Sequence, residues 1–511
     1  MNAVGLDGNS RRRARAWRAP RLVVITAVLG LASASCGGHP APAASASPVN
    51  SLTVKSCTVD GLAARCGTLI VPEDRLTGTG RTIPVRFVVF PATGPDRAPD
   101  PVVYFAGGPG SSAIADIPTW LSGFLSLNLN RDLVFIEQRG TGQSNPLNCP
   151  ASSLPLADKA ALRAAVESCL ARLHGDLQFY TTAMFTDDVS QILTDLHYAK
   201  ADLIGGSYGA TAEQVFLLRH PGQVRTMTLM NGTLLTIPIY EREPGNSELA
   251  LDYVFALCQS QPACHQAFPH LDADWAALWA SLGRSPWVLP AAQSPTGKTA
   301  RLDQDTLADD LYQLLHASEI APIPVAIHTL ATATNKVAAW ISVAKAFQAA
   351  GLTLTGGGAI PIMQYEILCA EPWASSTPAA LADQQGSFEY QNDLETAQWW
   401  QYVCPLIPKS AAAVGSQQLT SSSVPVLAFS GEADPADPSR NMAGMQQFWP
   451  DSRDITLPGQ GHSVASASWL CEGALIQAFI QQASVARLDT GCVATIAPAF
   501  PLTLQALAGG G

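Results

Sequence analysis

The sequence has few charged residues, no closely spaced pair of cysteines and no internal repeat. Only 14% of its 511 residues are charged and 47% are hydrophobic, which excludes an intrinsically disordered chain. Because no C-x-x-C is present, the eleven cysteines lack the paired-ligand motif of common zinc sites. We therefore expect a large globular protein, built as one domain with an insertion or as two domains, that needs no metal ion or other cofactor.

No hydrophobic run at the start of the chain is long enough to span a bilayer. The mostly apolar residues 22–31 follow six arginines, and together these features predict a signal peptide over residues 1–35. Two processing routes remain open: ordinary cleavage beside Ala34, or a lipoprotein signal in which Cys36 is lipidated and anchors the protein to a membrane. We favour the lipoprotein, with residues 36–54 as a flexible tether. Either route predicts a cell-envelope or secreted protein.

The sequence has fewer basic than acidic residues, and removal of a signal peptide would increase the difference. The formal net charge is −11, and removing residues 1–35 takes away six arginines and one aspartate, a further −5 that leaves −16. Such an acidic chain argues against nucleic acid as a partner.

The cysteines indicate disulfides in an oxidising compartment. Setting Cys36 aside leaves an even ten, which fall into neighbours along the chain. Buried free thiols are the alternative, because the sequence does not fix connectivity. The predicted pairs are Cys57–Cys66, Cys149–Cys169, Cys258–Cys264, Cys369–Cys404 and Cys471–Cys492.

The sequence around Ser207 predicts a sharp turn from a strand into a helix. Residues Gly205–Gly209 have the pattern G-x-S-x-G, whose glycines let neighbouring backbones pass closely. The apolar run 201–204 precedes the pattern, and residues 211–220 have helical spacing and end before Pro221. Because this setting holds the nucleophile of α/β-hydrolases, we predict that Ser207 is catalytic.

Two later segments supply the acid and the base that such a serine requires. Asp434 and Asp437 follow the apolar strand predicted at 424–430, and His462 lies in a glycine-rich loop after the last strand. The order Ser, Asp, His along the chain is that of α/β-hydrolases. We predict that His462 is the general base and that Asp434, nearer the strand end, orients it. Asp437 is the alternative acid, although its position suits the cap of a helix near Pro438.

The remaining pattern predicts the oxyanion donors and the domain plan. The apolar strand 101–106 ends in a Gly-Gly-Pro-Gly loop, and we assign the N–H groups of Gly108 and Tyr208 to the oxyanion hole. The predicted fold is α/β, a mostly parallel central sheet with helices on both faces and a large helical insertion. The core is divided between residues 55–232 and 424–511, and the cap segment is residues 233–423.

Five motifs together resemble the prolyl-iminopeptidase branch of the α/β-hydrolases, and in particular the exported tripeptidyl-aminopeptidase-like proteins of bacteria. These motifs are Phe105–Gly110, Glu137–Ser144, Gly205–Gly209, Gly431–Asp434 and Gly461–His462. The resemblance runs from about residue 55 to 495. It implies a serine exopeptidase that acts on free N-termini, with a triad of Ser207, Asp434 and His462.

An aminopeptidase must also bind a terminal ammonium, and a partly desolvated carboxylate in the cap segment would do so. We prefer Glu371 and then Glu366, beside the predicted Cys369–Cys404 bridge; Glu241 and Glu243 are further candidates. A solvated surface acid is the alternative for each.

The sequence therefore predicts an exported serine aminopeptidase that releases short peptides, of the tripeptidyl or prolyl type, through an acyl-enzyme. Its substrates would be peptides with a free N-terminus. Two alternatives stay open. One is a carboxylesterase or lipase with the same triad, and the other is an inactive envelope protein that uses the cap segment as a binding surface.

Overall fold

The computed structural model describes residues 50–148, 158–293, 299–352, 362–371, 374, 376–410, 418–463, 468–496 and 498–509. The predicted signal peptide, Cys36, Cys149 and most of the predicted tether lie outside the described residues.

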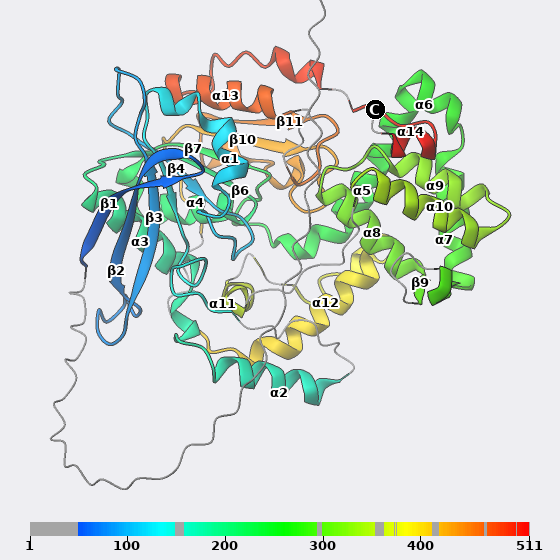
Figure 1. The fold of residues 1–511 in the computed structure, drawn as a ribbon, viewed down its shortest axis with the longest axis horizontal. Coiled ribbons are helices and arrows are strands. Elements are labelled where there is room, and N and C mark those ends of the chain that lie inside the picture. Colours follow the sequence, from blue (N-terminus) through cyan, green and yellow to red (C-terminus); the bar gives the residue numbers. More distant parts are fainter. Residues whose placement is uncertain are drawn as a thin grey trace, which may run out of the picture. The chain divides into compact units, whose positions relative to one another are not determined.

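Nine strands form one sheet in the order β1-β2-β3-β5-β4-β6-β7-β10-β11 (Figure 1). The antiparallel end consists of β1 (Leu52–Val59), β2 (Leu62–Pro72) and β3 (Thr82–Phe90), and β3 also runs antiparallel to β5. The other strands run parallel: β5 (Leu133–Ile136), β4 (Val102–Phe105), β6 (Ala201–Gly206), β7 (Val224–Met230), β10 (Val426–Gly431) and β11 (Ser452–Leu457). This mostly parallel sheet confirms the predicted fold class.

Helices cover both faces of the sheet, which explains why its central strands are continuous apolar runs. All four residues of β4 are buried, and they alternate between two hydrophobic clusters: Val103 and Phe105 belong to one, Val102 and Tyr104 to the other. The first cluster is completed by α2 (Lys159–Leu170), α3 (Thr182–Asp195) and α4 (Tyr208–Arg219). The second is completed by α1 (Ile117–Phe124) and α13 (Trp469–Gln482).

The segment between β7 and β10 is mainly helical and has a hydrophobic cluster of its own. Its helices are α5 (Ile239–Ser260), α6 (Pro262–Ala267), α7 (Leu271–Arg284), α8 (Gln304–His316), α9 (Ile323–Thr332), α10 (Lys336–Ala349), α11 (Ile362–Ala370) and α12 (Tyr390–Val403). A small antiparallel pair, β8 (Trp287–Leu289) with β9 (Ala300–Leu302), was not predicted. The last helix, α14 (Leu504–Ala508), packs against α10.

Strand β1 also differs from the sequence-based prediction, because it takes in Leu52–Val54 at the end of the predicted tether. It is an edge strand that pairs with β2 alone, and most of its side chains are exposed. A strand with so little apolar surface has no hydrophobic run to reveal it.

Four of the five predicted disulfides are present. They are Cys57–Cys66, Cys258–Cys264, Cys369–Cys404 and Cys471–Cys492, so the alternative of free thiols is wrong for these eight residues. Cys149 of the fifth predicted pair lies outside the described residues.

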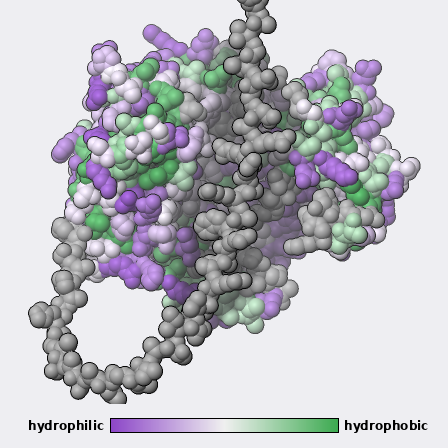
Figure 2. Space-filling view, in the orientation of Figure 1, coloured by the Kyte–Doolittle hydropathy of each residue, from purple (hydrophilic) through white to green (hydrophobic). Residues whose placement is uncertain are grey.

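The surface is mixed in character. On the coloured part of the face in Figure 2, hydrophilic and hydrophobic residues are interspersed. None of the helices within the described ranges combines the length and the hydropathy that crossing a bilayer requires.

Candidate active site

Ser207 lies in the turn that joins β6 to α4, with φ 56° and ψ −126°. Positive φ is uncommon for a residue with a side chain, and such strain is concentrated at functional turns. The flanking glycines are required by packing. A Cβ on Gly205 would lie 2.6 Å from the carbonyl carbon of Gly209, and a Cβ on Gly209 would lie 2.2 Å from the carbonyl oxygen of Phe105. The predicted strand–turn–helix is therefore present, and its glycines let β4, β6 and α4 meet.

His462 faces the carboxylate of Asp434. Its Nδ1 atom lies 3.1 Å from Oδ2 and 3.2 Å from Oδ1 of Asp434, which follows β10 and is fully buried. The amide of Asn231 donates to Oδ2 at 2.9 Å, and the N–H groups of Ala436 and Asp437 donate to Oδ1 at 2.8 and 2.9 Å. Burial opposes ionisation, but His462 and these donors outweigh it and lower the pKa of Asp434.

Asp437 does not cap a helix, so this interpretation of its position was wrong. The short helical turn Ser439–Asn441 has Pro438 at its N-cap and no side-chain cap. Asp437 instead is buried, accepts a hydrogen bond from the Thr233 hydroxyl, and lies 3.6 Å from Nδ1 of His462. Burial raises the pKa of Asp437 to about 7. A second carboxyl group therefore faces the same imidazole.

Nearby carboxylates favour the protonated, positively charged form of His462. Burial of its ring, whose side chain is 8% exposed, opposes protonation. Asp434, Asp437 and Glu243 outweigh burial and raise the pKa of His462 to about 9.

The Ser207 hydroxyl makes no hydrogen bond to His462, or to any other residue in the described ranges. Contacts of this kind are often long without substrate and tighten when the reacting group binds. His462 lies in the loop of residues 458–463, called the histidine loop below. Residues 464–467, which follow it, lie outside the described residues.

The loop that carries Gly108, one of the predicted oxyanion donors, passes beside the serine turn, and Tyr208, the other, directly follows Ser207. Gly107 lies beside the turn, because a Cβ on it would be 3.5 Å from the Cβ of Ser207, and Gly108 has φ +114°. Tyr208 is the first residue of α4. Its phenol oxygen lies 2.9 Å from Nε2 of Gln138 and 2.8 Å from Oγ1 of Thr182.

Glu371 and Glu366, the preferred ammonium ligands, are both buried and hydrogen bonded. Glu371 accepts from the N–H and the hydroxyl of Thr182 at 2.8 and 2.9 Å, and thereby joins the network of Tyr208. Glu366 accepts from the N–H of Ser410 at 3.1 Å, and burial raises its pKa to about 8. Glu241, a further candidate, lies in the first turn of α5.

Glu243, another candidate ammonium ligand, interacts electrostatically with His462 and Asp434. It is buried on α5, it accepts a hydrogen bond from the Tyr312 hydroxyl of α8, and burial raises its pKa to about 7. His462 favours its charge and Asp434 opposes it. On and beside α12, Glu389 Oε2 and Asp393 Oδ2 are buried without a hydrogen-bond partner in the described residues. The charge of Glu243 contributes to the raised pKa of both groups, and that of Glu389 to the raised pKa of Asp393.

Sequence reasoning missed Glu389 and Asp393. Glu389, Asp393 and the buried Ala397 are spaced four residues apart, so they lie on one face of the helix. This spacing is the only signal in the sequence that could have indicated that the face is buried.

The end of α8 holds the histidine loop, and this contact was also missed. The ring of His316 lies against that of His462, with centroids 4.3 Å apart. The N–H of Ser463 donates to the His316 carbonyl at 2.8 Å, and the N–H of Gly461 donates to the Ser318 hydroxyl at 2.9 Å. Burial, and then the charge of His462, lower the pKa of His316 to about 3, so this second ring is neutral and does not repel an imidazolium.

Two family models match the chain. Residues 100–260, which include Ser207, match the model described as alpha/beta hydrolase fold. Residues 391–492, which include Asp434 and His462, match the model described as TAP-like protein. No curated protein matches the sequence.

Solved structures that resemble the chain include a proline iminopeptidase from Mycobacterium smegmatis, with 16% identity, coverage of 82% of this chain and 99% of that one, and a TM-score of 0.35. An α/β-hydrolase enzyme from a Medee basin deep-sea metagenome library has 14% identity, 80% and 96% coverage, and a TM-score of 0.36. A thermophilic esterase from Thermogutta terrifontis has 12% identity, 82% and 99% coverage, and a TM-score of 0.33. At such values these likenesses carry no weight for the activity.

The strand order, the serine turn after β6 and the matches to the two family models agree. The chain has the α/β-hydrolase fold, with residues 100–260 similar to the alpha/beta hydrolase family model and residues 391–492 similar to the TAP-like protein model.

Proposed function

We propose that the protein is an exported serine aminopeptidase that removes short peptides from free N-termini. The observation that carries this proposal is the buried Glu243, which interacts electrostatically with the His462–Asp434 pair from α5 of the cap segment. A desolvated carboxylate near the reacting groups suits the terminal ammonium of a peptide, whereas an ester substrate has no charge to pair with it.

The proposed reaction proceeds through an acyl-enzyme. His462 takes the proton from Ser207, whose oxygen attacks the scissile carbonyl carbon, and then gives that proton to the leaving amine. Asp434 holds the ring through Nδ1. The N–H groups of Gly108 and Tyr208 stabilise the oxyanion, each by about 3 kcal/mol. A water molecule activated by the same histidine then hydrolyses the ester and frees Ser207.

The proposed ammonium ligand is Glu243 rather than Glu371. Both oxygens of Glu371 already accept hydrogen bonds from Thr182, and this network ties it to the side chain of Tyr208. Glu243 accepts one side-chain hydrogen bond, from Tyr312, and lies beside two further buried carboxyl groups. An arriving ammonium would neutralise part of this acidic cluster, so peptide binding would relieve the cost of burying it.

Export is supported by the four disulfides, which are typical of oxidising compartments. Cleavage after residue 35 and lipidation of Cys36 are part of this proposal.

A substrate panel tests the activity. Tripeptide anilides with free and blocked N-termini, a prolyl anilide and a short-chain nitrophenyl ester would be assayed with the wild type and with Ser207→Ala. We expect turnover of unblocked peptides alone, lost in Ser207→Ala. Ester turnover without peptide cleavage would instead identify a carboxylesterase, and no serine-dependent turnover would indicate a binding protein.

A second comparison tests the ammonium ligand. Glu243→Gln should raise KM for a free tripeptide anilide at least tenfold, because the charged partner of the ammonium is lost. KM for a blocked peptide or an ester, which has no ammonium to lose its partner, should be unchanged. Glu371→Gln is the matched variant, and a larger effect on KM from it than from Glu243→Gln would contradict the assignment.

A further inference from the structure

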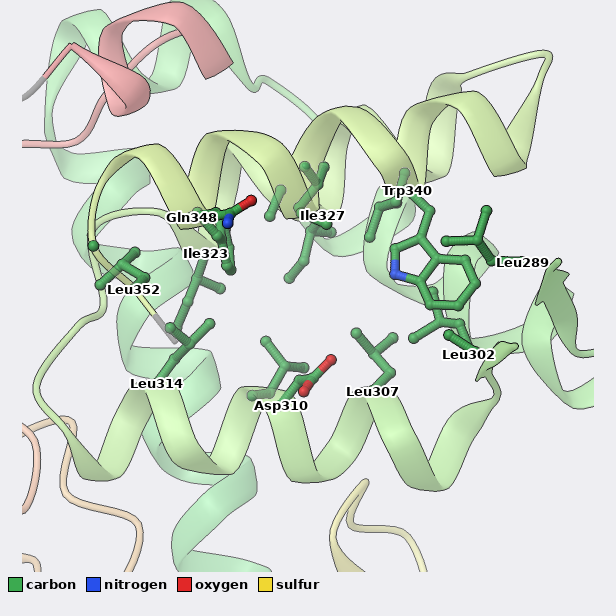
Figure 3. Close-up of a pocket in the computed structure, with 18 residues that line it drawn as sticks. Leu289, Leu302, Leu307, Asp310, Leu314, Ile323, Ile327, Trp340, Gln348 and Leu352 are labelled. Atoms are coloured by element: carbon green, nitrogen blue, oxygen red, sulfur yellow. The ribbon is translucent and has the colours of Figure 1, made fainter. Parts of the chain in front are cut away.

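A large apolar pocket lies within the cap segment, enclosed by α8, α9, α10 and the small β8–β9 pair (Figure 3). Its volume is about 540 Å³. In Figure 3, Leu307 and Leu314 point from α8 into the space. Ile323 and Ile327 of α9 lie across from them, and Trp340 lies at one end. This size and this lining are typical of sites for small molecules, which span roughly 300–1,000 Å³.

The pocket is separate from the candidate active site, because the two use opposite faces of α8. Pocket-lining Leu307, Asp310, Leu311 and Leu314 are spaced three and four residues apart, which places them on one face of the helix. Tyr312 and His316, one turn apart on the other face, contact Glu243 and His462.

Asp310 is the one ionisable residue among those that line the pocket in the described part of the chain. Its carboxyl group points into the space between Leu307 and Leu314 (Figure 3), and it has no hydrogen bond or ion pair with any described residue. Burial, with the neighbouring charge of Asp309, raises the pKa of Asp310 to about 7. Asp310 is half-buried, and a leucine would fill this position without the cost of partly desolvating an acid, so the carboxyl group is suited to a ligand that pairs with it.

We propose that this pocket binds a small amphiphile with a protonated amine and an unbranched apolar chain. The ammonium pairs with Asp310, and the chain packs against the leucines, isoleucines and Trp340. A bound cation compensates the half-buried carboxylate and is held by a charge-assisted hydrogen bond. No Lys, Arg or His stands among the described lining residues, so an anionic head group finds no partner and is repelled by Asp310.

The test is calorimetric titration of the full-length protein with octylamine, octanol and octanoate, above the pKa of about 7 at which Asp310 ionises. We expect one octylamine site with a Kd at least tenfold below that for octanol, and no binding of octanoate. Asp310→Asn should remove the preference for the amine and keep the weak octanol binding. Ala326→Phe, which places a ring in the pocket, should remove both.

Two control variants separate this pocket from other acidic sites. Asp305→Asn makes the same change at an exposed position of α8, and Glu243→Gln alters the candidate active site. Neither should change octylamine binding. The proposal is overturned if octylamine fails to bind, if octanol binds equally well, or if binding survives Asp310→Asn and is lost in Glu243→Gln. Melting curves establish that each variant is folded.

Discussion

At the residue scale, the candidate site is notable for the carboxyl groups around one imidazole. Asp434 accepts from Asn231 and from two backbone N–H groups, which is what a permanently ionised partner requires. Asp437 accepts from Thr233 alone and has its pKa raised to about 7 by burial. On these hydrogen bonds we propose that Asp434 orients His462 and that Asp437 tunes its charge.

This division predicts different outcomes for two matched variants. Asp434→Asn should lower kcat/KM about 10⁴-fold, because the ring loses its orienting acid. Asp437→Asn should retain activity and move the acid limb of the kcat/KM profile to lower pH. The sign follows because Asp437 raises the pKa of His462, and only the neutral ring acts as a base. An active Asp434→Asn with an inactive Asp437→Asn would reverse the two roles.

At the scale of elements, the cap segment helps to hold the histidine loop. Ser318, just past the end of α8, accepts from the N–H of Gly461 and donates to the Ser463 carbonyl, while His316 lies against His462. A Cβ on Gly461 would lie 1.6 Å from the Leu315 carbonyl oxygen, so the two backbones are in close contact. The loop that carries His462 is thus held by the sheet edge and by α8 together.

Ser318→Ala is therefore expected to lower kcat about tenfold with little change in KM, because a lost hydrogen bond of about 1 kcal/mol loosens the ring rather than the substrate. Ser342→Ala on α10, which removes an exposed hydroxyl bonded to the Ala338 carbonyl, is the matched control. Equal kcat values for both variants would show that the contact plays no part in positioning.

The elements differed in how far the sequence predicted them. The buried parallel strands were predicted because both of their faces are apolar, and the serine turn because Gly205 and Gly209 have no room for a side chain. The packing of His316 against His462 could not be predicted, because α8 and the loop after β11, which are distant in the chain, create it. The edge strand β1 was missed because its few apolar residues do not keep one alternation along the strand and most of its side chains are exposed.

At the scale of the whole molecule, several buried carboxyl groups with raised pKa values contribute to the dependence of stability on pH. Burial raises the pKa of Glu243, Asp310 and Glu472 to about 7, and that of Glu366 and Glu389 to about 8. Between the ordinary value near 4.5 and these raised values, the folded protein holds protons that the unfolded chain has lost. Stability contributed by these groups is therefore present at weakly acidic pH and is lost as the pH rises to about 8.

We accordingly expect the melting temperature to fall as the pH is raised from about 5 to 8, as measured by circular dichroism. Glu213 offers a test, because both of its carboxyl oxygens are buried without partners in the described residues and burial raises its pKa well above the usual value. Glu213→Gln should make the melting temperature less dependent on pH. A melting temperature that rises across this range would contradict the expectation.

The four observed disulfides each join cysteines that follow one another along the chain. A polypeptide that crosses a membrane from its N-terminus presents its thiols one after another. If the protein is exported and Cys36 is lipidated, as proposed above, an oxidase that links each thiol to the last one presented would yield these four pairs directly. Maturation would then proceed without an isomerase to reshuffle wrong bridges, even while later parts of the molecule are still being synthesised.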